Sequence, residues 1–193
     1  MKLHQLITIT GPSGSGKTTL ANHFFNPDQT LVSFTTRPKR PGEIDGIDYY
    51  FIHDNQLKEL EDEHKVIEED QYDNHFYGYT KDEIIDKLKD NNCVAVVTQK
   101  GYKTLKNLPF LKGHIIPVYI HTDYADIKKH MQNRNDNIDN INKRLKLFNT
   151  KNELVQEEEF KQDNAIIHNN IGLSIKESQD LFKRELLKYN INL

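Results

Sequence analysis

Short apolar runs alternate with amphipathic segments along the chain. The runs cover residues 6–10, 94–97, 115–120 and 165–168, and each has the length of a single strand. The segments between them place apolar residues at the spacing of a helix face. Strands that alternate with helices are typical of a parallel sheet flanked by helices, so the pattern predicts an α/β fold.

Two segments carry the sequence signal of a helix start. In Thr80-Lys81-Asp82-Glu83 and in Ser174-Ile175-Lys176-Glu177, a Thr or Ser stands three residues before a Glu. This spacing predicts reciprocal capping, in which each side chain bonds the other residue's backbone N–H. The residues expected on the buried faces of the two helices are Ile84, Ile85, Leu88, Leu181, Phe182 and Leu186.

A polar segment follows the first predicted strand and helix. Residues 30–79 are dense in Tyr, Arg, Pro and Asp, and contain only short strand-like pieces such as Tyr49 to Ile52. This composition favours an insertion that carries a ligand site. We expect the insertion to cover residues 32–80.

A second polar segment, residues 125–152, is rich in Asn, Asp, Lys and Arg. Its apolar residues recur at helical intervals, which predicts a helical lid over residues 123–152 rather than a disordered stretch. Residues 1–31, 81–122 and 153–193 are then expected to form the core. The apolar residues at helical intervals are Ile138, Ile141, Leu145 and Phe148.

Charge and cysteine content exclude several classes of protein. With 26 Lys and Arg against 29 Asp and Glu, and a pI near 6.3, the chain has no overall positive field for nucleic acid. The single cysteine, Cys93, cannot form an intrachain disulfide, which favours a reducing compartment. The first apolar run is too short for a signal core or membrane span, and the mean hydropathy is -0.77. We therefore expect a cytoplasmic protein that binds neither nucleic acid nor membranes.

A phosphate-binding motif follows the first predicted strand. Residues Gly11-Pro12-Ser13-Gly14-Ser15-Gly16-Lys17-Thr18 fit the pattern G-x-x-x-x-G-K-[ST] and precede a helix-compatible segment, Thr19 to Phe25. In such a loop, backbone N–H groups and the helix N-terminus form a cavity for an anion. We expect residues 11–19 to bind a nucleoside triphosphate. Lys17 is expected at the β- and γ-phosphates, and Thr18 is expected to hold Mg²⁺ through its hydroxyl.

The motif has one structural alternative, a glycine-rich turn with an accidental lysine. The complete motif between a predicted strand and a predicted helix favours phosphate binding over that alternative. The loop does not indicate whether the phosphoryl group goes to water, a protein or a small molecule. That choice depends on the rest of the chain.

Clustered cations in the insertion suit a second phosphate group. Arg37, Lys39 and Arg40 lie on a proline-stiffened segment, and tyrosines follow at residues 49–50 and 77–79. Their rings and hydroxyls could flank a base and its monophosphate. From residue types alone, a solvated basic loop beside tyrosines packed in a small core explains the same pattern.

Taken together, these motifs resemble those of guanylate kinases. The phosphate loop, the stretch Ser33–Phe51 and the segment Phe76-Tyr77-Gly78-Tyr79 occur in the order and spacing of that family. A weaker similarity continues through residues 138–145. The resemblance implies a P-loop NTPase fold with a parallel sheet flanked by helices, a small acceptor-binding insertion and a helical lid. The implied reaction is transfer of the ATP γ-phosphoryl group to GMP, which gives ADP and GDP with Mg²⁺ bound to the phosphates.

The resemblance also implies roles for individual residues. Ser33 and Glu68 would face the guanine, and a carboxylate suits that role because it can accept hydrogen bonds from N1–H and the exocyclic amine. Arg134 and Arg144 would reach from the lid to the transferring phosphoryl group and, with Lys17 and Arg37, neutralise its charge. The residues that would hold the GMP phosphate are Arg37, Arg40, Tyr49 and Tyr77.

Four positions depart from the family pattern. Val96 and Thr98 stand where acidic residues are usual at the end of a strand, and a threonine cannot supply negative charge. His130 stands where an arginine is common, and Tyr79 where a smaller hydroxyl residue is usual. One explanation is divergence around a retained activity, with Thr98 or a nearby acid such as Asp123 compensating.

Two further interpretations stay open on the sequence alone. The phosphate loop could serve a kinase for another nucleoside monophosphate, such as dGMP. Alternatively, the chain could be a catalytically weakened guanylate-kinase-like module that binds proteins. The complete loop with Lys17 and Thr18 argues against the second, because a scaffold has no evident need for a triphosphate cradle.

Overall fold

The computed structural model describes residues 3–72, 74–133, 141, 142, 145, 153–191 and 193. The chain divides into two compact units. One unit contains Met1–Ile7 and Phe25–Ile115, and the other contains Thr8–Phe24 and Ile116–Leu193. The predicted division into core, insertion and lid stays a prediction.

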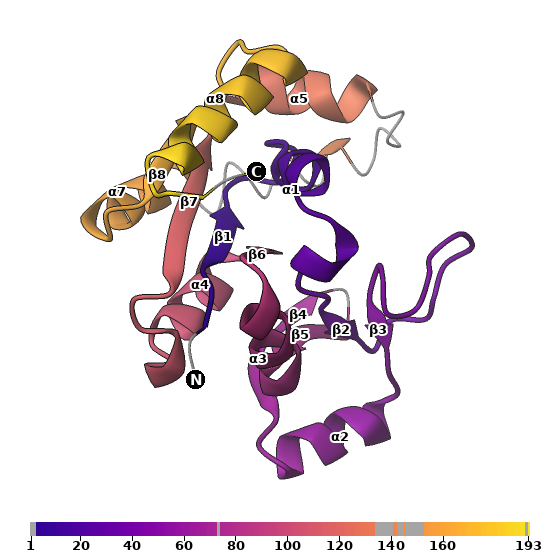
Figure 1. Ribbon diagram of the computed structural model, residues 1–193. Helices are drawn as coiled ribbons and strands as arrows, with labels where there is room; N and C mark the ends of the chain where they lie inside the picture. The colour runs from indigo at the N-terminus through magenta and orange to yellow at the C-terminus, as the bar shows by residue number, and fades with distance from the viewer. Residues whose placement is uncertain (1–2, 73, 134–140, 143–144, 146–152, 192) are drawn as a thin grey trace. The chain divides into compact units, whose positions relative to one another are not determined.

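The first unit contains a small mixed sheet and the helices around it (Figure 1). The strand order of this sheet is β3-β2-β5-β4, with β2 parallel to β3 and β5 antiparallel to both of its neighbours. The elements of the unit are η1 (Pro27–Gln29), β2 (Phe34–Thr35), β3 (Tyr50–Phe51), α2 (Asp54–Asp62), β4 (Val66–Tyr72), β5 (His75–Thr80), α3 (Lys81–Asp90), β6 (Cys93–Val96), α4 (Gln99–Lys106) and η2 (Pro109–Leu111).

The second unit carries the segment that follows β1 and the C-terminal helices (Figure 1). β1 (Leu6–Thr10) belongs in part to each unit, and the other four-stranded sheet has the strand order β6-β1-β7-β8. Strands β7 and β8 are parallel, with Val118 opposite Ile166. The other elements are α1 (Lys17–Phe24), β7 (Ile115–His121), α5 (Tyr124–Asn133), α7 (Glu153–Gln162), β8 (Ile166–Asn169) and α8 (Ile175–Leu187).

Burial explains why the apolar runs form strands. All five residues of β1 are buried, as expected for a strand covered on both faces. The predicted strand at residues 6–10 matches β1 residue for residue, and the strands predicted at 94–97 and 165–168 begin one residue away from β6 and β8. The α/β fold class predicted from this alternation is confirmed.

The two helix starts differ in their capping. At α8, Ser174 and Glu177 form the reciprocal bonds that the sequence predicts. At α3, Thr80 Oγ1 accepts from the N–H of Glu83 at 3.3 Å, but the Glu83 carboxylate accepts from the backbone N–H of Val32 and the hydroxyl of Tyr50. The prediction of reciprocal capping at α3 is therefore wrong, because contacts distant in sequence engage the carboxylate.

Part of the predicted lid pattern falls within the described residues. Ile141 and Leu145 are buried in one apolar cluster with Ile127 and Met131 of α5. This packing explains their helical spacing. Ile138 and Phe148 lie outside the described residues.

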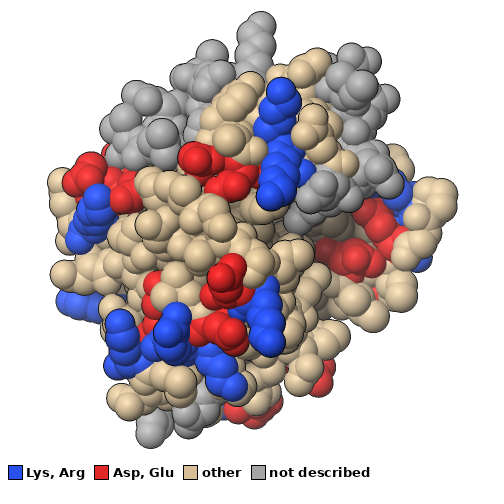
Figure 2. Space-filling model, turned by 90° about the horizontal axis from the view of Figure 1, so that it is seen from above, with Lys and Arg blue, Asp and Glu red and all other residues tan. Residues whose placement is uncertain are grey.

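Two further features concern helix apolarity and surface charge. Among the described residues, none of the helices has the length and apolarity needed to cross a membrane. On the face that Figure 2 shows, Lys and Arg side chains lie beside Asp and Glu side chains rather than forming an unbroken basic surface.

Candidate functional site

The phosphate loop connects β1 to α1 in the second unit, and its glycines are required by its shape. Gly11 has φ +143°, and a Cβ at this position would lie 2.7 Å from the carbonyl oxygen of Ile120. Gly16 has φ +96°, a conformation that side chains other than glycine rarely adopt. The sequence motif therefore corresponds to a tightly curled backbone.

The Lys17 side chain folds back and bonds the start of the phosphate loop. Its Nζ donates to the carbonyl oxygens of Gly11 at 2.8 Å and Pro12 at 2.6 Å. These bonds hold the ammonium group inside the curl of the backbone, where a bound phosphate would meet it. Thr18 follows at the start of α1 with an exposed side chain, so its hydroxyl can reach a metal ion.

Two side chains from other elements support the loop. His130 of α5 places Nδ1 3.1 Å from the carbonyl oxygen of Gly14, and Asn170 donates through Nδ2 to the carbonyl oxygen of Ser15 at 3.0 Å. The buried Ser15 Oγ and Asn170 Oδ1 have no hydrogen-bond partner among the described residues. Because buried polar atoms are normally satisfied, these two oxygens are candidates for contact with a ligand.

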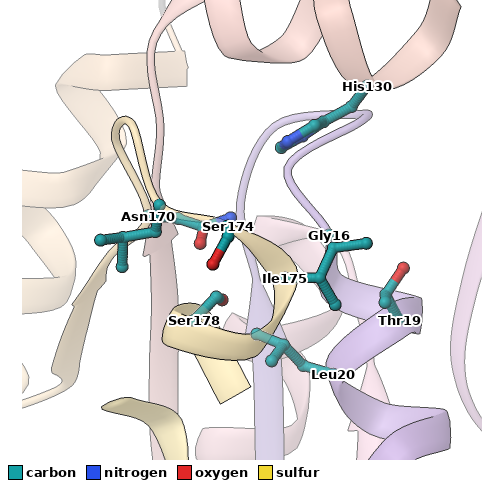
Figure 3. A pocket seen from close by; sticks show the side chains of 9 residues that line it. Gly16, Thr19, Leu20, His130, Asn170, Ser174, Ile175 and Ser178 are labelled. Atoms are coloured by element: carbon teal, nitrogen blue, oxygen red, sulfur yellow. The ribbon is translucent and has the colours of Figure 1, made fainter. Parts of the chain in front are cut away.

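A pocket of about 240 Å³ adjoins the end of the loop (Figure 3). Its surface is mostly apolar, with polar groups from α1, α5, α8 and the segment between β8 and α8. This composition suits a small organic group with a polar edge. The lining residues are Gly16, Thr19, Leu20, His130, Asn170, Leu173, Ser174, Ile175 and Ser178.

A buried histidine orients one of these polar groups. His168 of β8 is fully buried, with Nδ1 2.7 Å from Glu185 Oε2 and Nε2 3.0 Å from Ser178 Oγ. These two contacts hold the His168 ring and the Ser178 hydroxyl in fixed positions, with Ser178 lining the pocket.

The first unit contains a second pocket, of about 170 Å³. It brings together Ser33, Tyr49, Glu68 and Tyr77, all of which were predicted as site residues from the sequence. We refer to it below as the acceptor pocket. The complete lining is Ser33, Tyr49, Glu68, Asp70, Tyr77, Gly78, Tyr79, Val96, Val97 and Thr98.

Glu68 is the buried charge of the acceptor pocket. The residue is 7% exposed, and its carboxylate accepts no hydrogen bond from the described residues. The pKa of Glu68 is raised to about 7, mainly by burial and also by the charges of Asp70 and Glu69, while Lys100 acts in the opposite direction. A buried carboxyl without a protein partner and with a perturbed pKa is typical of a ligand-binding site.

Glu68 packs closely against two glycines, where a larger residue would clash with it. A Cβ on Gly101, in the first turn of α4, would lie 2.8 Å from Glu68 Oε1. A Cβ on Gly78 of β5 would lie 2.0 Å from the carbonyl oxygen of Glu68 and 2.6 Å from the Phe34 ring. The glycine in Phe76-Tyr77-Gly78-Tyr79 is therefore required by the approach of β4 and Phe34.

Arg37 is held beside the tyrosines of the same unit. Glu43 accepts from both of its terminal nitrogens, at 2.7 and 3.1 Å, and raises the pKa of the guanidinium. The guanidinium carbon lies 5.5 Å from the ring centre of Tyr49, whose ring lies 5.9 Å from that of Tyr77. The Arg40 side chain is exposed, with no ion-pair partner among the described residues. These cations and hydroxyls could bind a phosphate.

Comparison with known proteins identifies the family. The guanylate kinase family model matches residues 3–185. The chain belongs to the guanylate kinase family. It is 27% identical to a guanylate kinase from Hydrogenovibrio crunogenus, over 92% of this chain and 86% of that protein. It is 29% identical to one from Rickettsia prowazekii, over 95% of this chain and 92% of that protein.

A solved structure supports the fold. The crystal structure of guanylate kinase from Anaplasma phagocytophilum matches with a TM-score of 0.64, covering 100% of this chain and 89% of that chain. The two sequences are 18% identical, so this similarity concerns the fold alone. It agrees with the P-loop NTPase fold predicted from the sequence.

Three of the four departures from the guanylate kinase pattern lie in the acceptor pocket. Val96, Thr98 and Tyr79 all line it. Thr98 is engaged as the N-cap of α4, because its Oγ1 accepts from the N–H of Gly101 at 3.1 Å. Tyr79 donates through its hydroxyl to the carbonyl oxygen of Val96 at 3.4 Å, and burial raises its pKa.

The other residue expected to compensate, Asp123, is engaged elsewhere. Asp123 Oδ1 accepts from the N–H of Asp126 at 2.8 Å at the start of α5. His130, the fourth departure, contacts the carbonyl oxygen of Gly14 in the phosphate loop. Arg134 and Arg144, the predicted lid arginines, lie outside the described residues.

Sequence reasoning missed several pocket residues. Asp70 lies two positions beyond Glu68 on β4, so the two-residue period of a strand was the signal that could have found it. Asn170 and Ser178 had no such signal, because their contacts with Ser15 and His168 join segments 155 and 10 residues apart.

Proposed function

We propose that this protein transfers the γ-phosphoryl group of ATP to GMP, giving ADP and GDP. The observation that carries the proposal is the buried carboxylate of Glu68, which accepts no hydrogen bond from the part of the chain that the structure describes and lies in a pocket with aromatic hydroxyls. Guanine presents N1–H and an amino group on one edge, and both can donate to a carboxylate. Adenine lacks this pair of donors, so leaving the buried acceptor unpaired penalises AMP.

The phosphate loop supplies the donor side of the reaction. Its backbone N–H groups and Lys17 would bind the β- and γ-phosphates of ATP, and residues 11–19 would form the ATP-binding segment. The pocket beyond Gly16 would take the nucleoside, with Asn170 and Ser178 as polar contacts. These groups act by alignment and charge neutralisation rather than by exchanging protons with the substrate.

The acceptor side would hold GMP through its base and its phosphate. Glu68 and Ser33 would contact the guanine. Arg37, Arg40, Tyr49 and Tyr77 would bind the phosphate, with the Arg37 fork fixed in advance by Glu43. Arg134 and Arg144 are proposed to neutralise charge on the transferring phosphoryl group from a lid at residues 123–152.

The residues present suit a magnesium ion that arrives with ATP. Mg²⁺ prefers oxygen ligands and keeps several waters, and the exposed Thr18 hydroxyl is such a ligand at the phosphate loop. Thr18, water and the nucleotide phosphates would hold the ion, and the ion would neutralise charge on the phosphates. The single cysteine and the nucleotide substrates suit a cytoplasmic enzyme.

A coupled assay of ADP release tests the proposal. The reactions contain ATP and Mg²⁺ with GMP, dGMP, AMP, CMP or UMP as separate acceptors. We expect turnover that depends on GMP and is at least about tenfold lower with AMP. Equal rates with AMP and GMP would refute guanine recognition. Silence with every acceptor, while ATP still binds, would refute the kinase activity.

A further inference from the structure

The acceptor pocket contains a second carboxylate that the sequence motifs did not assign. Asp70 lines the pocket together with Glu68, two residues earlier on β4. In the β4–β5 hairpin, Glu68 pairs with Tyr79 and Asp70 pairs with Tyr77. Because residues two apart on a strand and their direct partners share one face, these four side chains form one polar patch.

The carboxylate of Asp70 is held in place with one oxygen available. Its Oδ1 lies 3.6 Å from Lys100 Nζ and accepts from the N–H of Gln71 at 3.1 Å. Lys100 is itself fixed, since Nζ donates to the carbonyl oxygen of Glu69 at 2.7 Å. Oδ2 has no partner among the described residues. The Asp70 side chain is 43% exposed, so its carboxylate is accessible to a ligand in the pocket.

Other residues at the end of β6 offer no comparable acceptor. Val96 is apolar, the Thr98 hydroxyl caps α4, and the Val96 carbonyl is approached by the Tyr79 hydroxyl. Val96 and Thr98 therefore give the pocket no negative charge, whereas Asp70 of β4 does. The charge of Asp70 contributes to the raised pKa of Glu68.

We propose that Asp70 is a specificity-determining residue that accepts a hydrogen bond from the 2-amino group of guanine, while Glu68 accepts from N1–H. This inference rests on the proposed function, because it takes GMP as the occupant of the acceptor pocket. A guanine edge presents three N–H bonds, one on N1 and two on the amino group. Two carboxylates on one strand face match that row of donors better than one.

Comparison of GMP with IMP isolates the interaction. IMP keeps the N1–H and 6-oxo groups but lacks the 2-amino group. Asp70→Ala should lower kcat/KM for GMP by about 10-fold to 100-fold, the range for a hydrogen bond to a charged group. It should leave kcat/KM for IMP within about twofold. Asp70→Asn, which keeps a neutral acceptor, should lie between Asp70→Ala and the unmodified protein.

Matched controls separate charge from contact. Asp62→Ala makes the same charge change in the exposed last turn of α2, outside the pocket, and should change neither substrate. Thermal unfolding and circular dichroism of each variant check the fold. Calorimetric titration with GMP and IMP, without ATP, gives the same comparison independently of turnover.

The outcomes distinguish this inference from the proposed function. Equal losses for GMP and IMP in Asp70→Ala, or no loss for either, would overturn the role of Asp70 while leaving the kinase intact. Absence of GMP-dependent turnover in the unmodified protein would overturn the proposed function. In that case the titration still shows whether Asp70 binds the 2-amino group. If the unmodified protein does not bind GMP at all, both the proposed function and the role of Asp70 are overturned.

Discussion

Arg37 and Glu43 form a two-point ion pair that is largely shielded from water. Nη2 of Arg37 lies 2.7 Å from Oε1 of Glu43, Nη1 lies 3.1 Å from Oε2, and the two side chains are 9% and 20% exposed. The N–H of Arg40 also donates to Oε2, at 2.8 Å. Such geometry fixes a guanidinium far better than an exposed pair does. Glu43 therefore positions Arg37 before any substrate arrives.

Removal of Glu43 tests this positioning. Glu43→Ala should raise KM for GMP by about tenfold and leave KM for ATP unchanged, because Arg37 loses its orientation and must be ordered on binding. Glu43→Gln keeps the shape and one acceptor, so its effect should be smaller. Steady-state kinetics with each substrate varied in turn measures both constants. A lower KM for GMP in Glu43→Ala would show instead that the carboxylate competes with the substrate phosphate.

Local patterns in the sequence predicted the fold and located the phosphate loop. The family resemblance predicted four residues that line the acceptor pocket, and their roles stay predictions. β1 was predicted residue for residue because Leu6 to Thr10 form a short apolar run directly before a loop with a fixed motif, and the structure buries all five residues. Contacts between segments far apart in the chain could not be predicted from local sequence patterns. Glu83 bonds Val32, 51 residues away, and His130 contacts Gly14 across 116 residues.

Lys17 is expected to be essential for phosphoryl transfer. Lys17→Ala removes the positive charge at the phosphates and the two bonds to the loop carbonyls. We expect kcat to fall by at least about 100-fold, the usual cost of losing one preorganised stabilising group. The coupled assay measures kcat. Lys183→Ala, on the exposed face of α8, serves as the matched control and should retain full activity, and an unchanged kcat in Lys17→Ala would remove the role of Lys17.

Gly101 is expected to control GMP binding through Glu68. In Gly101→Ala, the new methyl group would lie 2.8 Å from Glu68 Oε1, so the carboxylate must move. Because the displaced atom is the end of a flexible side chain, the melting temperature should change by only a few degrees. KM for GMP should rise by at least about tenfold, with KM for ATP unchanged. An unaltered KM for GMP would mean that the carboxylate position is not used in binding.

Stability should also depend on pH through Glu68. Burial raises its pKa from the ordinary 4.5 to about 7, so the folded protein holds this proton more tightly than the unfolded chain does. The resulting stabilisation is present below pH 4.5 and is lost as the pH rises through about 7. Glu68→Gln, which cannot ionise, should therefore gain in relative stability by about 2–3 kcal/mol between pH 4.5 and 8. Urea unfolding of both proteins at several pH values measures this difference, and a constant difference would contradict the raised pKa.

Protonation of Glu68 should also weaken GMP binding. Guanine N1–H donates to the ionised carboxylate, so GMP affinity of the unmodified protein should fall as the pH drops below about 7. The phosphate of GMP also titrates in this range, but it does so equally with Glu68→Gln. The ratio of the two affinities therefore reports Glu68 alone. Calorimetric titration at pH 6, 7 and 8 should show this ratio rising with pH, and a flat ratio would assign guanine recognition to another residue.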